Sequence, residues 1–389
     1  MMGPLNRRQV LATGVLALVG AATGRTRLVE AAPQVDAPTV ISWKPPLYHG
    51  WPTLARRANG ELLLVFSGGR ESHVCPFGRV ELMRSHDNGK TWNWPQVVYD
   101  GPIDDRDAGV LETPQGSILV TTFTSLAYAD GLEKALKIPA GNPAAWPDLK
   151  LREWTAVHDR ISPEQRQMEL GNWMLRSTDG GVNWSSRYRV PVNSPHGPVA
   201  LKNGHLLYVG AALWTPQRLV GACTSTDDGL TWEWTATIPT RPGDNPLEYH
   251  ELHAVEACDG TIICHIRNHN NPNARETLQT ESTDGGKTWT TPHPIGVWGI
   301  PSHLLRLKDG RLLMSYGYRR KPFGNQARLS EDNGKTWGEP ITLSDDGIGG
   351  DLGYPSTVEC DDGTLVSVWY ERLKDSPLAQ LRQTRWKLG

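Results

Sequence analysis

Apolar runs of strand length recur six times along the chain, each directly after a short turn pair. The runs are NGELLLVF from Asn59, QGSILVTTF from Gln115, NGHLLYVG from Asn203, DGTIICHIR from Asp259, DGRLLMSYG from Asp309 and DGTLVSVWY from Asp362. Asn-Gly and Asp-Gly favour two-residue hairpin turns, because both central positions of such turns require positive φ. A second strand-like run precedes each pair, so we expect six antiparallel hairpins.

A second repeat, Ser-x-Asp-x-Gly-x-x-Trp, occurs five times. Its copies are SHDNGKTW from Ser85, STDGGVNW from Ser177, STDDGLTW from Ser225, STDGGKTW from Ser282 and SEDNGKTW from Ser330. The Asp side chain can accept hydrogen bonds from turn amides, Gly permits the backbone conformation, and Trp can pack between strands. We therefore expect these boxes to be structural turns, which indicate the fold and leave the function open.

Together the two repeats predict an all-β fold. Each unit of about 50 residues supplies an inner hairpin and an outer hairpin whose turn is the box, and six such units form a six-bladed β-propeller of four-stranded antiparallel blades. The second unit is longer, and we interpret residues 126–170 as an insertion with a helix capped by Ser162 and begun by Pro163. The last unit lacks a box, and PTVISW from Pro38 can supply a strand that closes the ring.

Composition fits this picture. Gly (40) and Pro (29) are frequent, as expected for many short strands joined by turns. The net charge of -2 gives no reason to expect nucleic acid or an anionic membrane as a partner. Five cysteines form no obvious disulfide framework.

The N-terminal segment has the features of an export signal. Arg7 and Arg8 precede an apolar run that is too short to span a bilayer, which is typical of a Tat-type signal. We expect residues 1–32 to be this signal, residues 33–389 to be the propeller, and the protein to be periplasmic or extracellular.

Counting from the hairpin turns places polar residues of the inner strands at one end of the central channel. Eight residues before each turn lie Trp51, Asp107, Pro195, Glu251, Pro301 and Tyr354. Two residues away on the same strand face lie His49, Asp105, His253 and His303. Beyond the turns come Arg267, Arg319 and Glu371. Acids, bases and cations thus converge in register, and we expect a site at this mouth, with His49 and Trp51 among its substrate-binding residues.

The boxes and the propeller resemble the sialidase (neuraminidase) superfamily, and three further stretches strengthen the resemblance. ELHAVEACDGTIICHIRNH resembles the family segment whose glutamate and second arginine would be Glu251 and Arg267. GYPSTVECDDGTLVSVWYE resembles the segment whose tyrosine nucleophile and late glutamate would be Tyr354 and Glu371. DGRLLMSYGYRRKPFG lies where the third arginine belongs, which makes Arg319, or its neighbour Arg320, the candidate.

The resemblance implies an exo-acting glycosidase that releases a terminal sialic acid or a related acidic sugar from a glycan, without a cofactor. The carboxylate on the anomeric carbon of a sialic acid repels a carboxylate nucleophile but not a neutral Tyr. A Tyr with a pKa of about 10 needs a base, here Glu251. Arginines would bind the substrate carboxylate in bidentate fashion.

The sequence departs from the family at two places. In YHGWP, residues 48–52, Gly50 falls where the first arginine belongs and His49 stands beside it. The loop GGRESHVCPFG from Gly68 lacks the usual general-acid Asp. Arg70 is a candidate replacement for the cation. The candidate replacements for the acid are Glu71, His73, Asp105 and Asp107.

Two other functions fit the same residues. One is hydrolysis or β-elimination of uronic-acid glycans, with His49 or His73 acting with Tyr354. The other is glycan binding without catalysis. Residues 126–170 either shape the substrate pocket through Trp146 and Trp154 or form a solvated decoration. No metal site is expected, because His265 and His269 flank Arg267 without further ligands at suitable spacing.

Overall fold

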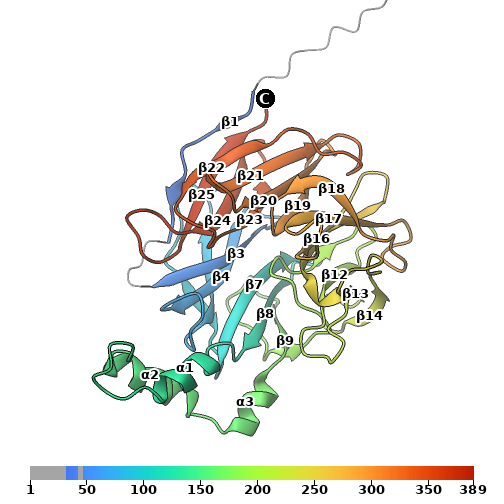
Figure 1. Ribbon diagram of the computed structural model, residues 1–389. Helices are drawn as coiled ribbons and strands as arrows, with labels where there is room; N and C mark the ends of the chain where they lie inside the picture. Colours follow the sequence, from blue (N-terminus) through green and yellow to red (C-terminus); the bar gives the residue numbers. More distant parts are fainter. Residues whose placement is uncertain (1–31, 43–46) are drawn as a thin grey trace, which may run out of the picture.

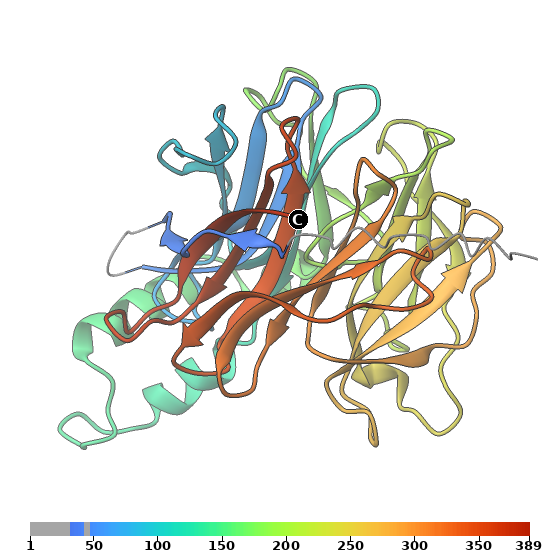
Figure 2. The ribbon, with the colours of Figure 1, turned by 90° about the horizontal axis from the view of Figure 1, so that it is seen from above.

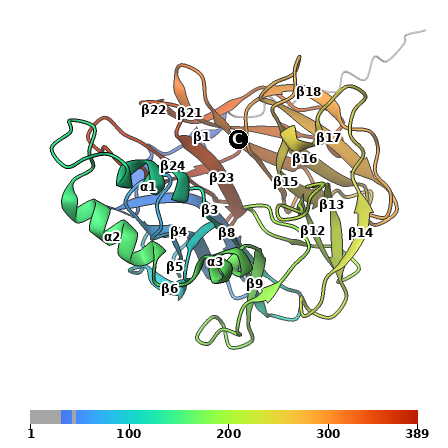
Figure 3. The same ribbon diagram turned by 60° about the horizontal axis from the view of Figure 1, so that its bottom comes forward.

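The computed structural model describes residues 32–42 and 47–389. Its strands form six antiparallel sheets around a common centre, which confirms the six-bladed propeller (Figures 1 and 3). Apolar clusters fill the space between neighbouring blades; one of them joins Leu54 and Leu64 of blade 1 to Val366 and Val368 of blade 6. Blade-to-blade packing therefore supplies the core.

Blades 1 to 3 each consist of consecutive strands. Blade 1 contains β3 (Tyr48–Arg56), β4 (Leu62–Arg70), β5 (Arg79–Ser85) and β6 (Gln96–Tyr99). Blade 2 contains β7 (Asp104–Glu112), β8 (Ile118–Ser125), β9 (Asn172–Ser177) and β10 (Tyr188–Arg189). Blade 3 contains β11 (Val199–Ala200), β12 (Leu206–Ala211), β13 (Val220–Ser225) and β14 (Glu233–Thr237).

Blades 4 and 5 repeat this arrangement, whereas blade 6 combines both ends of the chain. Blade 4 contains β15 (Tyr249–Glu256), β16 (Ile262–Asn268), β17 (Glu276–Ser282) and β18 (His293–Trp298), and the 3-10 helix η1 (Pro246–Glu248) precedes it. Blade 5 contains β19 (Ser302–Arg306), β20 (Leu312–Tyr318), β21 (Phe323–Ser330) and β22 (Ile341–Gly347). Blade 6 contains β23 (Leu352–Glu359), β24 (Leu365–Glu371), β25 (Gln380–Lys387), β1 (Gln34–Val35) and β2 (Thr39–Val40).

Residues near the N-terminus close the ring. Gln34 pairs with Lys387 and Thr39 pairs with Gln383, so β1 and β2 both add to β25. The expected closing strand in PTVISW is confirmed for Thr39–Val40. The proposed export signal lies outside the described residues, apart from Ala32.

The inner hairpins turn differently from the expectation. In the first one, Arg57 N donates to Glu61 O (2.8 Å) and Gly60 N donates to Arg57 O (2.9 Å). Gly60 alone of the pair has positive φ (89°), and the Asn59 side chain accepts from Glu61 N. The same backbone pattern recurs at the other five turns. The prediction of two-residue turns was wrong. Where a polar side chain of the turn accepts a hydrogen bond from a nearby backbone amide, only the glycine that follows needs positive φ.

The Asp boxes are structural turns, as predicted. In the first box, Asp87 Oδ1 accepts from Thr91 N (2.9 Å) and from Ser85 Oγ (2.8 Å), and Ser85 Oγ accepts from Gly89 N. Trp92 of this box donates to Gln383 Oε1 in blade 6, so the box also contacts the neighbouring blade. Burial alone would raise the pKa of Asp87, but these hydrogen bonds lower it to about 2.

Three helices lie between β8 and β9 of blade 2. They are α1 (Ala129–Leu136), α2 (Asp148–His158) and α3 (Pro163–Glu169). Ser162 caps α3 through a capping box and Pro163 begins it, as expected. Figures 1 and 2 show the helices gathered at one corner of the molecule. Among the described residues, no helix is long and apolar enough to cross a membrane.

Replacing Asp87 with Asn tests the box turn. The variant loses a charge that accepts several hydrogen bonds, so we expect about 1 kcal/mol lower unfolding free energy at pH 7, reduced by solvent exposure. The pKa of Asp87 is depressed in the folded state. Its contribution is therefore present above about pH 4 and is lost as the pH falls toward 2.

Thermal unfolding at several pH values measures this difference, which must shrink on acidification. Asp375→Asn, at an exposed loop position, serves as control. A constant difference between pH 7 and pH 3 would contradict the assignment.

Candidate active site

The inner strands are bulged where they reach the mouth of the channel. The pairing register shifts near the start of β3, β7, β15 and β23. Trp51 (φ 53°), Asp107 (φ 47°) and Tyr354 (φ 52°) have left-handed backbone there. Such a conformation costs a non-Gly residue on the order of 1–3 kcal/mol and persists only where the surrounding structure enforces it. The strain therefore falls at the sequence positions that were predicted to form the site.

Tyr354, Glu251 and Arg267 form one hydrogen-bonded cluster. The Tyr354 hydroxyl donates to Glu251 Oε1. Arg267 Nη1 donates to Glu251 Oε1 (2.8 Å) and to the Tyr354 hydroxyl (3.0 Å). The structure thus brings together the three residues that the resemblance implied as nucleophile, base and cation.

Electrostatics keep Tyr354 neutral and Glu251 ionised. Burial raises the pKa of Tyr354 well above its ordinary value, and the negative charge of Glu251 raises it further. Burial would also raise the pKa of Glu251, but Arg267, His250 and the Tyr354 hydrogen bond bring it down to about 2. Tyr354 is therefore a neutral phenol, and the carboxylate of Glu251 already accepts its hydrogen bond.

Arg319 and Arg320 have different surroundings. The Arg319 guanidinium carbon lies 5.9 Å from the Tyr354 ring centre, and its Nε donates to Leu352 O (3.1 Å). The Arg320 guanidinium lies 3.5 Å over Trp298 instead. Of these two candidates, Arg319 is the one beside Tyr354.

Asp107 lines a cavity of about 100 Å³ next to the cluster. Glu251, His250, Arg218 and Phe123 contribute to the same wall. The Asp107 side chain is 7% exposed, and its Oδ1 has no hydrogen-bond partner among the described residues. Burial raises the pKa of Asp107 to about 7, against the opposing charge of Arg106. Asp107 can therefore donate or accept a hydrogen bond in a deep part of the site.

The environment of Arg70 does not favour a role in substrate binding. Arg70 is fully buried and forms a bidentate ion pair with Asp104 (2.5 and 3.0 Å). Its remaining N–H groups are directed to other protein oxygens, including His73 O. Its donors are thus taken up inside the protein.

Arg106 is a cation at the mouth that sequence reasoning missed. Its guanidinium carbon lies 4.6 Å from the Trp51 ring centre. Among the described residues its Nε has no hydrogen-bond partner. Arg106 could have been found from the sequence, because it lies next to Asp107, one residue from the position that was counted from the hairpin turn.

His73 is oriented by a carboxylate that was also missed. His73 Nδ1 lies 2.9 Å from Asp351 Oδ1, which also accepts from the Tyr48 (3.0 Å) and Tyr370 (3.2 Å) hydroxyls. The His73 side chain is 47% exposed, and its ring meets Trp51 edge-on. Asp351 therefore holds the His73 ring in one orientation, while about half of the side chain remains accessible to solvent.

The other two predicted general acids, Glu71 and Asp105, form hydrogen bonds outside the cluster of Tyr354, Glu251 and Arg267. Glu71 accepts from Trp154 Nε1 of α2 (2.9 Å) and borders a groove of about 530 Å³ beside the helices. Asp105 is buried, accepts from Gly101 N (2.6 Å), and burial raises its pKa well above the ordinary value.

Two predicted substrate-binding residues are enclosed by the protein. His49 is buried, with Nδ1 3.1 Å from Ser42 O and its ring against Phe66. Glu371 is buried in an ion pair with Arg382 (2.5 Å) and accepts from Trp369 Nε1.

Three histidines pack beside Tyr354. His253 and His303 stack with ring centres 4.5 Å apart, and His196 contacts both of them and the Tyr354 ring. Burial lowers the pKa of His196 to about 3 and those of the other two well below the ordinary value. The three rings are therefore neutral, and His196 is the one that packs against Tyr354.

Comparison with known proteins agrees with this architecture. The model of the BNR repeat-like domain family matches residues 125–367. A sialidase from Paraclostridium sordellii is 22% identical over 75% of this chain, and one from Micromonospora viridifaciens is 26% identical over 44%. These matches span 57% and 31% of the length of those two sialidases.

Solved structures show the same fold. A protein of unknown function from Dyadobacter fermentans has a TM-score of 0.73 at 25% identity, over 92% of this chain and 100% of its own. Trypanosoma rangeli sialidase in complex with sialic acid has a TM-score of 0.60 at 17% identity, over 91% of this chain and 60% of its own. With five Asp boxes, six blades and a family match over more than half of its length, the chain belongs to the BNR repeat-like domain family.

Proposed function

We propose that this protein is an exo-acting, retaining glycoside hydrolase of sialidase type, which releases terminal sialic acid or a related acidic sugar. The hydrogen-bonded cluster of Tyr354, Glu251 and Arg267 carries this proposal. The matches to curated sialidases support it.

Tyr354 acts as the nucleophile and Glu251 as its base. The Tyr354 oxygen forms a bond to the anomeric carbon while the bond from that carbon to the leaving oxygen breaks. The phenolic proton passes to Glu251 Oε1, which already accepts the hydrogen bond. In the second half-reaction, water attacks the anomeric carbon as the bond from that carbon to the Tyr354 oxygen breaks. Glu251 returns the phenolic proton to Tyr354, the residue that protonated the leaving group takes the proton from the water, and the sugar leaves with retained configuration.

Substrate binding activates the base. Without substrate, Arg267 helps to hold the pKa of Glu251 at about 2, which makes it a weak proton acceptor. The sugar carboxylate competes for the donors of Arg267, and Glu251 regains basicity as that ion pair weakens. Binding of the anion and activation of the nucleophile are thus one event.

Arg267, Arg319 and Arg106 form the carboxylate-binding set. Arg106 compensates for the arginine that is absent at Gly50, because it is a cation at the mouth and Arg70 is engaged with Asp104. The flat face of Trp51 restricts the Arg106 guanidinium.

His73 donates the proton to the leaving group. The leaving group of an exo-acting enzyme extends toward solvent, and His73 is half-exposed whereas Asp107 lines a deep cavity. Asp351 fixes the His73 ring through Nδ1. Asp107 then contacts a substituent of the bound sugar.

Replacing Tyr354 with Phe tests the nucleophile. The phenol oxygen is lost with little change in shape, so we expect release of fluorophore from a fluorogenic α-sialoside to fall by about 10³-fold or more. Tyr318→Phe, near Arg320 and Trp298, serves as the matched control and keeps wild-type turnover. Undiminished turnover by Tyr354→Phe would remove Tyr354 from the chemistry.

Inactive wild-type protein would contradict the sialidase proposal. Screening uronic-acid glycans for products that absorb in the near ultraviolet would then detect β-elimination. Binding of a glycan without product, surviving in Tyr354→Phe, would indicate a non-catalytic propeller.

Replacing His73 with Ala tests the general acid through leaving-group dependence. We expect a loss of about 10²-fold or more in kcat on sialyllactose, whose alcohol leaving group needs a proton. On a nitrophenyl sialoside the loss is small, because that leaving group departs as an anion. Asp107→Asn, compared by the same steady-state kinetics, lowers both rates to a similar degree. Equal losses in His73→Ala would contradict the role.

Replacing Arg106 with Gln tests the third cation. Losing one charged hydrogen-bonding group costs about 1.5–3 kcal/mol, so we expect about 10- to 100-fold weaker binding of free sialic acid by titration calorimetry. Arg320→Gln is the matched control, because Arg320 also stacks on a Trp but lies over Trp298. Equal affinities of Arg106→Gln and wild type would exclude Arg106 from the carboxylate-binding set.

A further inference from the structure

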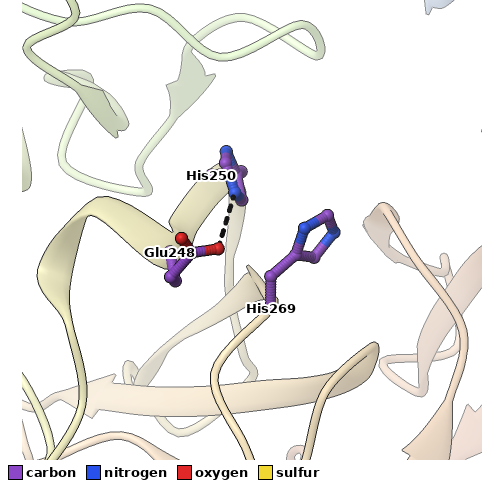
Figure 4. A group of neighbouring side chains, drawn as sticks. All are labelled: Glu248, His250 and His269. Carbon is purple, nitrogen blue, oxygen red and sulfur yellow. Dashed lines mark ion pairs between the residues drawn. The ribbon is translucent and has the colours of Figure 1, made fainter.

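Glu248, His250 and His269 form a cluster beside the catalytic residues that the reaction does not use. Glu248 ends η1, His250 lies at the start of β15, and His269 follows β16. The neighbouring strands hold them together, because Tyr249 pairs with Asn268 and His269 N donates to Glu248 O (3.0 Å). Figure 4 shows the three side chains turned toward a common space.

The geometry of this cluster suits a metal ion. One ligand atom from each residue lies within 4.8 Å of the other two, and Glu248 Oε2 is 3.8 Å from His250 Nε2. His250 Nε2 is buried and has no hydrogen-bond partner among the described residues. The rings of His250 and His269 also lie close together, with their centres 4.6 Å apart. Two imidazoles and one carboxylate are a common three-residue ligand set for Zn²⁺.

We propose that Glu248, His250 and His269 bind Zn²⁺ or a similar divalent transition metal, and that the bound metal lowers the activity of the site. The sequence did not predict this metal site, because only His269 lies near Arg267 along the chain. Glu248 and His250 come from the preceding strand and its 3-10 helix.

The inhibitory effect follows from the hydrogen bond between Arg267 and His269. His269 Nε2 accepts from Arg267 Nε (3.1 Å), while its other ring nitrogen is on the side of Glu248 and His250 (Figure 4). A metal on that nitrogen, Nδ1, requires the ring proton to move to Nε2. Two N–H donors would then face each other, so Arg267 must shift. The same side chain holds Glu251 and Tyr354 through Nη1.

Zinc titration of the full-length, tag-free protein tests the site directly. Calorimetry and competition with a chromophoric chelator should show one site in the wild type and at least about 10-fold weaker binding in Glu248→Gln and in His250→Gln. His293→Gln is the matched control, because His293 pairs with Glu281 (2.8 Å) but belongs to no three-ligand cluster among the described residues. Failure of the wild type to bind, or equal binding by Glu248→Gln, would overturn the site.

The inhibitory effect has its own measurement, which rests on the proposed function. Zn²⁺ should inhibit turnover of the fluorogenic sialoside at the concentration that fills the site, and Glu248→Gln should require at least about 10-fold more metal. Turnover that persists in the metal-saturated wild type would overturn the inhibition and leave the site in place. If the protein does not turn over sialosides, the proposed function fails, whereas the calorimetry still decides whether the metal site exists.

Discussion

The hydrogen bonds of Arg267 join two blades of the propeller, and the candidate site depends on them. Arg267 and Glu251 lie on neighbouring strands of blade 4, whereas Tyr354 lies on blade 6. Blade 6 is completed by β1 and β2, which pair with β25 and close the ring. Two short N-terminal strands thus help to fix the distance between Tyr354 and Glu251, the proposed nucleophile and base. Tyr354 has its left-handed backbone inside this closed ring, where His196 packs against its side chain, and such strain persists only where the surrounding structure enforces it.

The charged side chains at the mouth of the channel are not all paired with a charge of opposite sign. Arg70 is neutralised by Asp104 and Glu371 by Arg382, so these pairs belong to the scaffold. Arg106 has no such ion pair among the described residues, and burial raises the pKa of Asp107 to about 7, so Asp107 does not fully neutralise the cations near it. Removing charges from water is costly unless they are paired. An anionic ligand placed near the cations would restore the balance.

The regular spacing of the turn pairs and Asp boxes along the chain predicted the six blades, because every unit repeats the same kinds of turn-forming residues. The register count found Trp51, Asp107, Glu251 and Tyr354 because each lies where an inner strand is bulged, at one offset from its turn. The count could not predict the pairing of Arg70 with Asp104, since that contact depends on how two blades pack. It also missed Asp351, which lies just before β23 and reaches His73 from another blade. The turn type was missed because hydrogen bonding by the Asn or Asp side chain changes how many positions need positive φ.

Under the proposed function, a preference for acidic sugars follows from activation of Glu251 as well as from attraction of the sugar carboxylate. In the ligand-free site, Arg267 contributes to a pKa of about 2 for Glu251, so the acceptor of the Tyr354 hydrogen bond is a poor base. A neutral sugar can occupy the mouth of the channel without drawing Arg267 away from Glu251, and Tyr354 then keeps its proton. A carboxylate competes directly for the same guanidinium donors and weakens the ion pair that suppresses Glu251. Because one side chain controls both recognition and basicity, a substrate that lacks the negative charge is bound less tightly and is also left unactivated.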